Sequence, residues 1–202
     1  MRLVLDWDGT VTERDTLALV IEWFGDGGTY RRNGQLMGRS LTHDQALASS
    51  FATVRAQLPE VVDRLRSTVR IRPGFRELVE RHRPLVISSG FHELIEPVLA
   101  RDGIDVELLA NRIDARSDGW RVRFRDVAVC PECGEPCKRS ALPSGAVAYV
   151  GDGYSDRCAA RAATRVFATA GLAEWLASVG VAYTRFDDFY DVLAALEART
   201  RG

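Results

Sequence analysis

LVLDWDGTVTERDT, residues 3–16, begins with a short apolar run and then places two aspartates, Asp6 and Asp8, on either side of a tryptophan. Aspartate and glycine are common in turns, so one interpretation is an ordinary loop after a strand. The other is a catalytic pair of carboxylates at the carboxyl edge of a parallel sheet, where open α/β folds bind ligands. The rest of the sequence decides between them.

Composition and charge limit the class of protein. The 202 residues are 46% hydrophobic and carry a formal net charge of −1, which suits one domain with an insertion and gives no sign of a nucleic-acid partner. No apolar run reaches the roughly 20 residues that a membrane helix needs, and acids come too early for a signal peptide with its apolar stretch of about 7–15 residues. We expect a cytoplasmic protein that binds neither nucleic acid nor membranes; its oligomeric state stays open.

Short apolar runs alternate with helical patterns through most of the chain. The runs that end at polar or glycine residues are 3–6, 84–88, 147–151 and 165–168. The helical patterns between and after them are 74–82, 91–101, 154–163 and 187–199. Such runs fit strands that are buried on both faces of a parallel sheet. The order predicts an α/β fold with right-handed crossovers.

Residues 15–70 interrupt this alternation, because they contain no convincing strand. Helical patterns at 15–25, 42–58 and 59–69 flank a glycine-rich stretch, 25–40, that we interpret as a loop. The segment therefore predicts a helical insert after the first strand.

A second interruption, residues 112–125, predicts a β-hairpin. WRVRF at 120–124 alternates apolar residues with arginines and follows the turn signal Ser-Asp-Gly at 117–119. The arginines on its polar face are Arg121, Arg123 and Arg125. We interpret them as the solvated face of a strand rather than as a nucleic-acid surface.

Polar groups follow three of the predicted strands. They are Asp6 and Asp8 after the first, Ser88, Ser89 and Gly90 after the second, and Asp152 and Asp156 after the third. Because the carboxyl ends of parallel strands meet at one edge, we expect these groups to converge. Lys138 supplies a positive charge before the third strand. Clustered carboxylates repel one another unless a cation is bound, and oxygen ligands favour Mg²⁺.

In this order and spacing, the motifs resemble those of the haloacid dehalogenase superfamily of phosphatases. The matching residues are D-x-D-G-T at 6–10, Ser88, Lys138 and G-D-G-x-x-D at 151–156. The resemblance covers nearly the whole chain. It implies a Rossmann-like core made of residues 1–14 and 71–202, with a helical cap, residues 15–70, inserted after the first motif.

The resemblance also implies the roles of the two aspartates in the opening stretch. Asp6 would attack phosphorus and form an aspartyl-phosphate. Asp8 would protonate the leaving oxygen and then activate water. The dehalogenases of the superfamily lack this second aspartate, so its presence points to a phosphatase.

Metal and phosphate contacts are implied in the same way. Asp152, a carboxylate oxygen of Asp6 and the carbonyl of Asp8 would hold Mg²⁺, and Asp156 would either orient Lys138 or bind a metal-bound water. The predicted phosphate ligands are Ser88, Lys138 and the backbone amides near Ser89 and Gly90.

The substrate is predicted less directly. Asp15 stands where phosphoserine phosphatases usually have glutamate, and residues 37–51 resemble their cap, but Ser50 occupies the position of their carboxylate-binding arginine. CPECGEPCKRSAL at 130–142 and the tail at 186–197 resemble the methionine-salvage (MtnX-like) phosphatases. The resemblance implies hydrolysis of a small phosphorylated metabolite like 2-hydroxy-3-keto-5-methylthiopentenyl-1-phosphate. The alternatives are a phosphoserine phosphatase or phosphoryl transfer to a small alcohol.

The cysteines leave three interpretations open. Cys130, Cys133 and Cys137 are candidate zinc ligands, with Cys158 or His92 as the fourth, but reduced thiols or a disulfide fit the sequence too. A zinc knuckle that binds nucleic acid without catalysis is the alternative of another class, and the neutral charge is against it. His92 follows Ser88-Ser89-Gly90-Phe91 and is expected either to touch substrate or to cap its own helix.

Overall fold

The computed structural model describes residues 1–198. Its centre is a seven-stranded sheet with the order β4-β3-β2-β1-β5-β6-β7. Strand β1 (Arg2–Leu5) lies in the middle, parallel to both β2 (Leu85–Phe91) and β5 (Val147–Gly151). The predicted α/β fold with a parallel Rossmann-like sheet is confirmed.

The outer strands complete the sheet on both sides. They are β3 (Glu107–Asp114), β4 (Arg121–Arg123), β6 (Arg165–Ala168) and β7 (Thr184–Arg185). The predicted hairpin is present, because β3 and β4 pair antiparallel. However, β3 begins earlier than expected and also pairs parallel with β2, so the hairpin is the edge of the main sheet. The sequence did not predict this, since a short apolar run such as 108–110 does not distinguish strand from helix.

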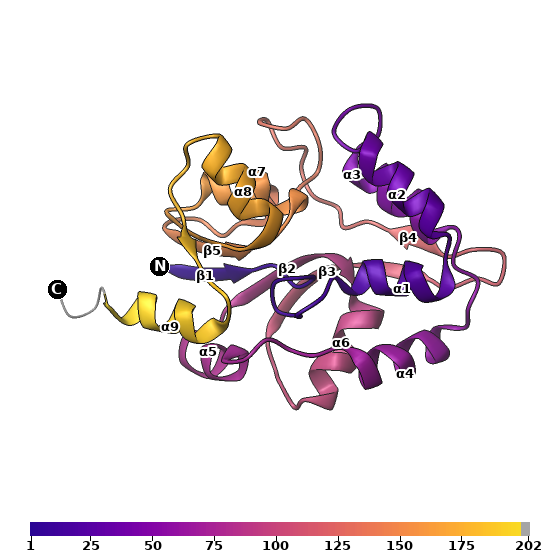
Figure 1. Cartoon of the computed structure of the whole chain (residues 1–202), viewed down its shortest axis with the longest axis horizontal. Helices are drawn as coiled ribbons and strands as arrows, with labels where there is room; N and C mark the ends of the chain where they lie inside the picture. The colour runs from indigo at the N-terminus through magenta and orange to yellow at the C-terminus, as the bar shows by residue number, and fades with distance from the viewer. Residues whose placement is uncertain (199–202) are drawn as a thin grey trace.

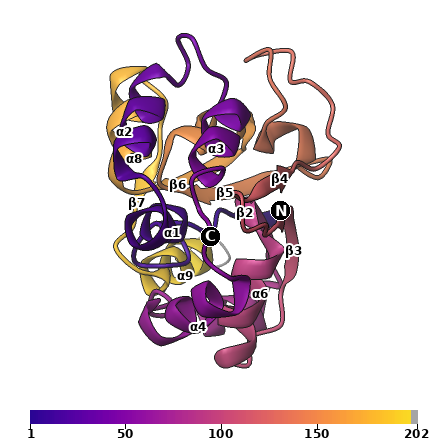
Figure 2. The same cartoon turned by 90° about the vertical axis from the view of Figure 1, so that its right-hand side faces the viewer.

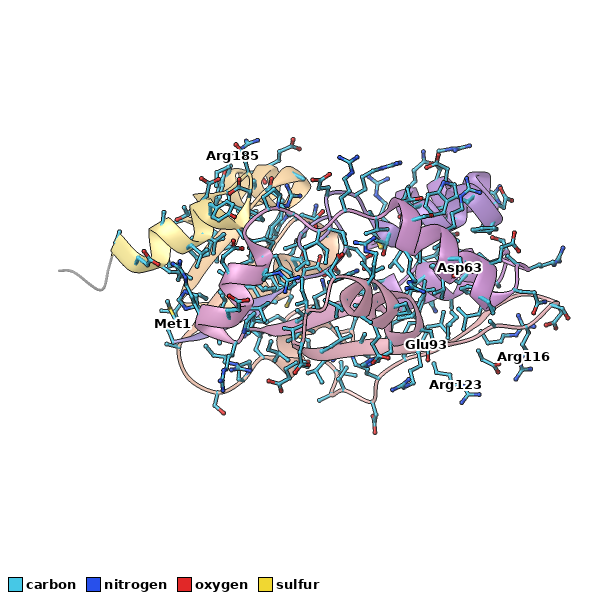
Figure 3. All side chains as sticks on the ribbon, turned by 90° about the horizontal axis from the view of Figure 1, so that it is seen from below. Met1, Asp63, Glu93, Arg116, Arg123 and Arg185 are labelled. Carbon is cyan, nitrogen blue, oxygen red and sulfur yellow. The ribbon has the colours of Figure 1, made fainter. Side chains whose placement is uncertain are left out.

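Two of the three hairpin arginines point away from the body of the protein. Arg121 pairs with Asp118, and Arg123 pairs with Asp114; Arg123 extends from the sheet edge in Figure 3. Arg125 differs, because it is partly buried. The arginines therefore do not form one continuous basic strip.

Helices cover both faces of the sheet, with α7 and α8 on one side and α5, α6 and α9 on the other (Figure 1). Their bounds are α5 (Phe75–His82), α6 (His92–Arg101), α7 (Arg157–Ala162), α8 (Ala170–Ser178) and α9 (Phe189–Ala198). The helix predicted at 154–163 starts as a 3₁₀ turn, Tyr154–Asp156, before α7. Arg199, the last residue of the final predicted helix, lies outside the described residues.

The insert is helical, as predicted, but contains one helix more than expected. Its helices are α1 (Thr16–Phe24), α2 (Gly27–Leu36), α3 (His43–Phe51) and α4 (Leu58–Thr68). Helix α2 occupies the glycine-rich stretch that we interpreted as a loop. Asp26 caps it by accepting from the amides of Gly28 and Thr29, and Asn33 on its inner face is buried. A cap and a buried contact thus outweigh the poor helix propensity of glycine.

The four inserted helices are divided between the two sides of the sheet. Figure 2 shows α2 and α3 on the side of the sheet that carries α8, whereas α4 lies beside α6 on the opposite side. The Arg101 side chain of α6 donates to the carbonyl of Val69 at 2.8 Å, next to the end of α4. We keep residues 15–70 as the proposed cap, with α2 and α3 as its outer part. Within residues 1–198, no helix has the length and apolar character needed to cross a membrane.

Candidate active site

The loop after β1 places the carboxylates of Asp6 and Asp8 in the lining of the same cavity. The Trp7 side chain between them is fully buried, and the Trp7 carbonyl accepts from the amides of Val11 at 2.9 Å and Thr12 at 3.1 Å. Gly9 has φ of +79°, and a Cβ there would collide with the Asp152 carboxylate. The turn therefore requires glycine both for its backbone angle and for its close approach to another strand end.

A buried ion-pair network joins Asp6, Lys138 and Asp156. The ammonium of Lys138 donates to Asp6 and, at 2.7 Å, to Oδ1 of Asp156. All three side chains are at most 5% exposed. Burial by itself lowers the pKa of Lys138, but the charges of Asp156 and Asp6 outweigh burial and hold that pKa above its ordinary value. Lys138 is thus a fixed cation beside the predicted nucleophile.

Asp156 already uses both carboxylate oxygens. Besides Lys138, Oδ1 accepts from the Tyr149 hydroxyl at 2.7 Å, and Oδ2 accepts from the amides of Asp152 at 3.1 Å and Gly153 at 2.9 Å. Of its two predicted roles, this geometry favours orientation of Lys138.

Tyr149 was expected only as a strand residue, yet its hydroxyl belongs to this network. We predict that Tyr149→Phe lowers the free energy of unfolding by about 1.5–3 kcal/mol, because a buried carboxylate loses a donor. Urea unfolding of the wild type and the variant measures this. Tyr190→Phe is the matched control, since the Tyr190 hydroxyl bonds Glu77 on the surface and its loss should change little. Equal effects of the two substitutions would contradict the prediction.

Asp8 has its own set of partners. The amide of Thr16 donates to Oδ1 at 3.1 Å, the Thr16 hydroxyl donates to the same oxygen, and the Ser88 hydroxyl donates to Oδ2 at 3.2 Å. Burial first, and then the charges of Asp15 and Asp6, raise the pKa of Asp8 to about 7. A carboxyl group that titrates near neutrality suits a proton donor that later becomes a base.

The carboxylates fit a divalent cation. Oxygens of Asp6, Asp152 and Asp156 lie within 4.8 Å of one another. Burial, followed by the charges of Asp6 and Asp156, raises the pKa of Asp152 to about 9, and burial with the charge of Asp156 raises that of Asp6 to about 6. The single ammonium of Lys138 thus faces three carboxylates. Carboxylate oxygens are the kind of ligand that Mg²⁺ prefers. Asp6 and Asp152 have lone pairs left to hold it, whereas Asp156 is occupied.

The second half of β2 contributes Ser88, Ser89 and Gly90. Ser88 is fully buried, and its hydroxyl accepts from the Gly90 amide at 2.8 Å while donating to Asp8. A Cβ on Gly90 would lie 2.9 Å from Oδ2 of Asp8, so a side chain there would displace the carboxylate. Gly90 therefore holds Ser88 in place, and Ser89 lines the cavity described next.

A cavity of about 290 Å³ lies between these carboxylates and the insert. The insert residues that line it include Asp15, Tyr30, Asn33, Met37, His43, Leu47 and Ser50. Asp15 was predicted. It also caps α1, accepting from the Ala18 amide at 2.9 Å, and accepts from the Tyr30 hydroxyl at 3.4 Å. Tyr30 and Asn33 were missed because they belong to the unexpected helix α2.

The structure corrects the predicted role of His92 in contacting the substrate. Its Nδ1 lies 2.7 Å from an Oε1 of Glu96, and its Nε2 accepts from the Ala110 amide at 3.3 Å. Both ring nitrogens are therefore engaged between α6 and β3, and His92 does not line the cavity. The structure does not bring it to the cavity or to the cysteine cluster.

Arg72 is a positioning residue that motif reasoning missed. Its guanidinium donates to the carbonyls of Gly9 at 2.9 Å and Thr10 at 3.0 Å, and to the carbonyl of Asp187 at 2.7 Å. It thereby ties the aspartate loop to the C-terminal part of the chain.

The four cysteines converge at a second cluster. The sulfurs of Cys130, Cys133, Cys137 and Cys158 lie within 4.8 Å of one another, and no pair is bonded. Of the two proposed fourth members, it is Cys158 that joins the other three.

Comparison with known proteins identifies the family. A family model described as haloacid dehalogenase-like hydrolase matches residues 3–161, a range that contains all of the motifs above. The chain belongs to this family.

Individual proteins that are similar to this haloacid dehalogenase-like hydrolase are phosphatases by name. It is 27% identical over 209 residues to a 2-hydroxy-3-keto-5-methylthiopentenyl-1-phosphate phosphatase of Geobacillus kaustophilus, with 96% of this chain and 94% of the relative covered. The enzyme of the same name from Geobacillus thermodenitrificans is 28% identical over 211 residues with the same coverage. A phosphoserine phosphatase solved as a phospho-aspartyl intermediate analogue shares the fold, with a TM-score of 0.68, 17% identity, and coverage of 96% of this chain and 97% of that chain.

Proposed function

We propose that the protein is a Mg²⁺-dependent phosphatase that hydrolyses a small phosphorylated metabolite through an aspartyl-phosphate on Asp6. The observation that carries the proposal is that two aspartates two residues apart have different hydrogen-bond partners. Asp6 is held by the ammonium of Lys138, whereas Asp8 is held by hydroxyl and amide donors and has a pKa of about 7. One carboxylate is thus placed to attack, and the other to move a proton.

The first half of the reaction follows from these positions. A carboxylate oxygen of Asp6 forms a bond to phosphorus while the bond from phosphorus to the substrate oxygen breaks. Asp8 gives its proton to that leaving oxygen, so a neutral alcohol departs. Lys138 and Ser88 donate to the phosphoryl oxygens, which stabilises the charge that builds up on them.

In the second half, Asp8 acts as a base. It takes a proton from water as the water oxygen bonds to phosphorus, and the bond between phosphorus and Asp6 breaks. Inorganic phosphate leaves and both aspartates return to their starting states. Bound Mg²⁺, held by Asp6 and Asp152, would lower the repulsion between the carboxylates and an anionic phosphate.

The insert favours a substrate whose leaving group carries no carboxylate. Ser50, which replaces the expected arginine, is buried and donates to the Ala46 carbonyl at 2.7 Å while accepting from the Asn33 amide at 3.0 Å. Asp15 adds negative charge to the same cavity, and the arginine that lines it, Arg31, is exposed. An acidic group on the substrate would therefore meet repulsion without a buried partner.

Hydroxyl or keto groups with an apolar tail fit this lining better. Asn33 and Tyr30 offer neutral polar atoms, and Leu17, Met37 and Leu47 offer apolar ones. We therefore favour a substrate of the type named in the Geobacillus relatives, 2-hydroxy-3-keto-5-methylthiopentenyl-1-phosphate, over phosphoserine.

Selectivity provides the first test. We expect kcat/KM for that keto phosphate to exceed kcat/KM for phosphoserine at least about tenfold, which corresponds to roughly 1.4 kcal/mol of transition-state binding. Phosphate release from both esters measures it, and added glycerol shows whether the phosphoryl group passes to an alcohol instead of water. A preference for phosphoserine would reverse the substrate assignment, and a glycerol phosphate product would replace hydrolysis by transfer.

Metal removal provides the second test. Treatment with EDTA is expected to lower phosphate release at least about 100-fold, because the carboxylate cluster then repels the substrate. Addition of Mg²⁺ in excess should restore the rate, whereas Ca²⁺, with its longer and more flexible coordination, should restore little. Undiminished release in EDTA would contradict the metal requirement.

A further inference from the structure

The four cysteines belong to two segments that are far apart in the sequence. Cys130 and Cys133 form a compact turn, in which the Gly134 amide donates to the Cys130 carbonyl at 2.9 Å and the Cys130 amide donates to the Glu135 carbonyl at 3.0 Å. Cys137 follows a bridge between residues 129 and 136. Cys158 comes from helix α7, and its Sγ lies 3.4 Å from that of Cys130.

This spacing fits a tetrahedral metal site. Zinc–sulfur bonds of about 2.3 Å place neighbouring thiolate sulfurs about 3.8 Å apart, and all four sulfurs here lie within 4.8 Å of one another. A disulfide joins sulfurs at about 2.05 Å and would satisfy only two of them. Thiolates select zinc over the hard cations that carboxylates bind.

We propose that Cys130, Cys133, Cys137 and Cys158 bind one Zn²⁺. On binding, the four thiols lose four protons and form four zinc–sulfur bonds, so the centre carries a net charge of −2. Four arginines, Arg39, Arg125, Arg157 and Arg161, line the cavity of about 500 Å³ that Cys133, Cys137 and Cys158 also line. In two of them, Arg125 and Arg157, the Nε atom is buried with no hydrogen-bond partner among the described residues. Positive charge on the wall of this cavity would offset part of the negative charge of the thiolate centre.

The site has a consequence for the catalytic lysine. Cys137 directly precedes Lys138, and Cys158 follows Asp156 by two positions. Lys138 and Asp156 form the buried ion pair at 2.7 Å. Zinc therefore cross-links the two segments that carry this pair and fixes the ammonium beside Asp6. The effect on Lys138 rests on the proposed function, whereas the metal site itself does not.

Metal content tests the site directly. Protein purified under reducing conditions with trace zinc in the medium should contain about one zinc per chain, and Cys158→Ser should contain less than about 0.1. Ser140→Ala is the matched control, because Ser140 is an exposed residue of the 3₁₀ turn Lys138–Ala141 that follows Cys137; it should retain one zinc. Wild-type protein with less than about 0.1 zinc would overturn the proposal, as would an intact mass about 2 Da low from a disulfide.

Cobalt substitution keeps the test valid if a cysteine variant does not fold. Wild-type protein loaded with Co²⁺ should show the visible absorption of tetrahedral cobalt thiolate. Cys158→His, which keeps a metal ligand, should retain a metal with a shifted spectrum. A colourless cobalt complex, or an octahedral spectrum, would contradict a four-cysteine site.

The positioning role has a separate readout. A zinc-selective chelator, with Mg²⁺ in excess, should lower kcat and raise KM to different extents. The factor by which kcat falls should be about ten times the factor by which KM rises, because Lys138 acts on the phosphoryl group rather than on the leaving group. The Cys158→His variant, which keeps a metal ligand, should have most of the wild-type kcat. Zinc without phosphatase activity in the wild type would remove the proposed function and leave the metal site intact. Unchanged kcat after zinc removal would overturn the positioning role.

Discussion

Asp6→Asn is expected to reduce phosphate release by at least about 10⁴-fold, because an amide cannot form the covalent intermediate. Asparagine keeps the shape of the side chain and still accepts a hydrogen bond from Lys138, which also remains paired with Asp156. The loss should therefore reflect chemistry and not unfolding. Steady-state phosphate release from the purified variant measures it.

Covalent labelling separates this prediction from a general loss of binding. Acid-quenched wild-type protein should carry label from a ³²P-substrate, whereas Asp6→Asn should carry none. Asp187→Asn is the control, since the Asp187 side chain is exposed, at 88%, and its substitution should leave both rate and label unchanged. A labelled Asp6→Asn variant would move the nucleophile elsewhere.

Asp8→Asn should lower phosphate release by about 10² to 10⁴-fold, the usual contribution of a general acid–base group. The size of the loss should depend on the substrate. A p-nitrophenolate leaves without a proton, so the first step should be slowed much less for p-nitrophenyl phosphate than for an alkyl phosphate. The second step always needs the base.

That asymmetry gives a specific signature. With p-nitrophenyl phosphate, Asp8→Asn should release a burst of one nitrophenol per chain and then accumulate the phosphorylated enzyme. Rapid-quench measurement of label and nitrophenol follows both. Equal losses for alkyl and aryl esters, without accumulation of label, would show that Asp8 acts only by electrostatics or position.

Motif order alone predicted that the polar groups of three strands would lie close together, and the structure brings them together. Asp6 and Asp152 follow β1 and β5, and Ser88 comes directly after the apolar first half of β2. These three parallel strands lie side by side, with their carboxyl ends at one edge of the sheet. Apolar strands specify the sheet, and the sheet then gathers the polar residues that terminate them. For these positions, local sequence was sufficient.

Elements outside that rule were harder to predict. Helix α2 forms in a glycine-rich stretch because Asp26 caps it and Asn33 packs inward against Ser50. Strand β3 was missed at its start, since pairing with β2 rather than its own pattern makes it a strand. In both cases tertiary contacts outweigh a weak local signal.

The sequence by itself determined the α/β core, the family motifs and the paired aspartates, because these depend on hydrophobic period and on which residues end each strand. Only the tertiary structure decided which distant side chains share a site. It placed Tyr149 on Asp156, Cys158 among the other cysteines, and His92 between α6 and β3 instead of in the cavity. Such contacts depend on how packed layers bring together segments that are far apart along the chain, and no local pattern specifies that.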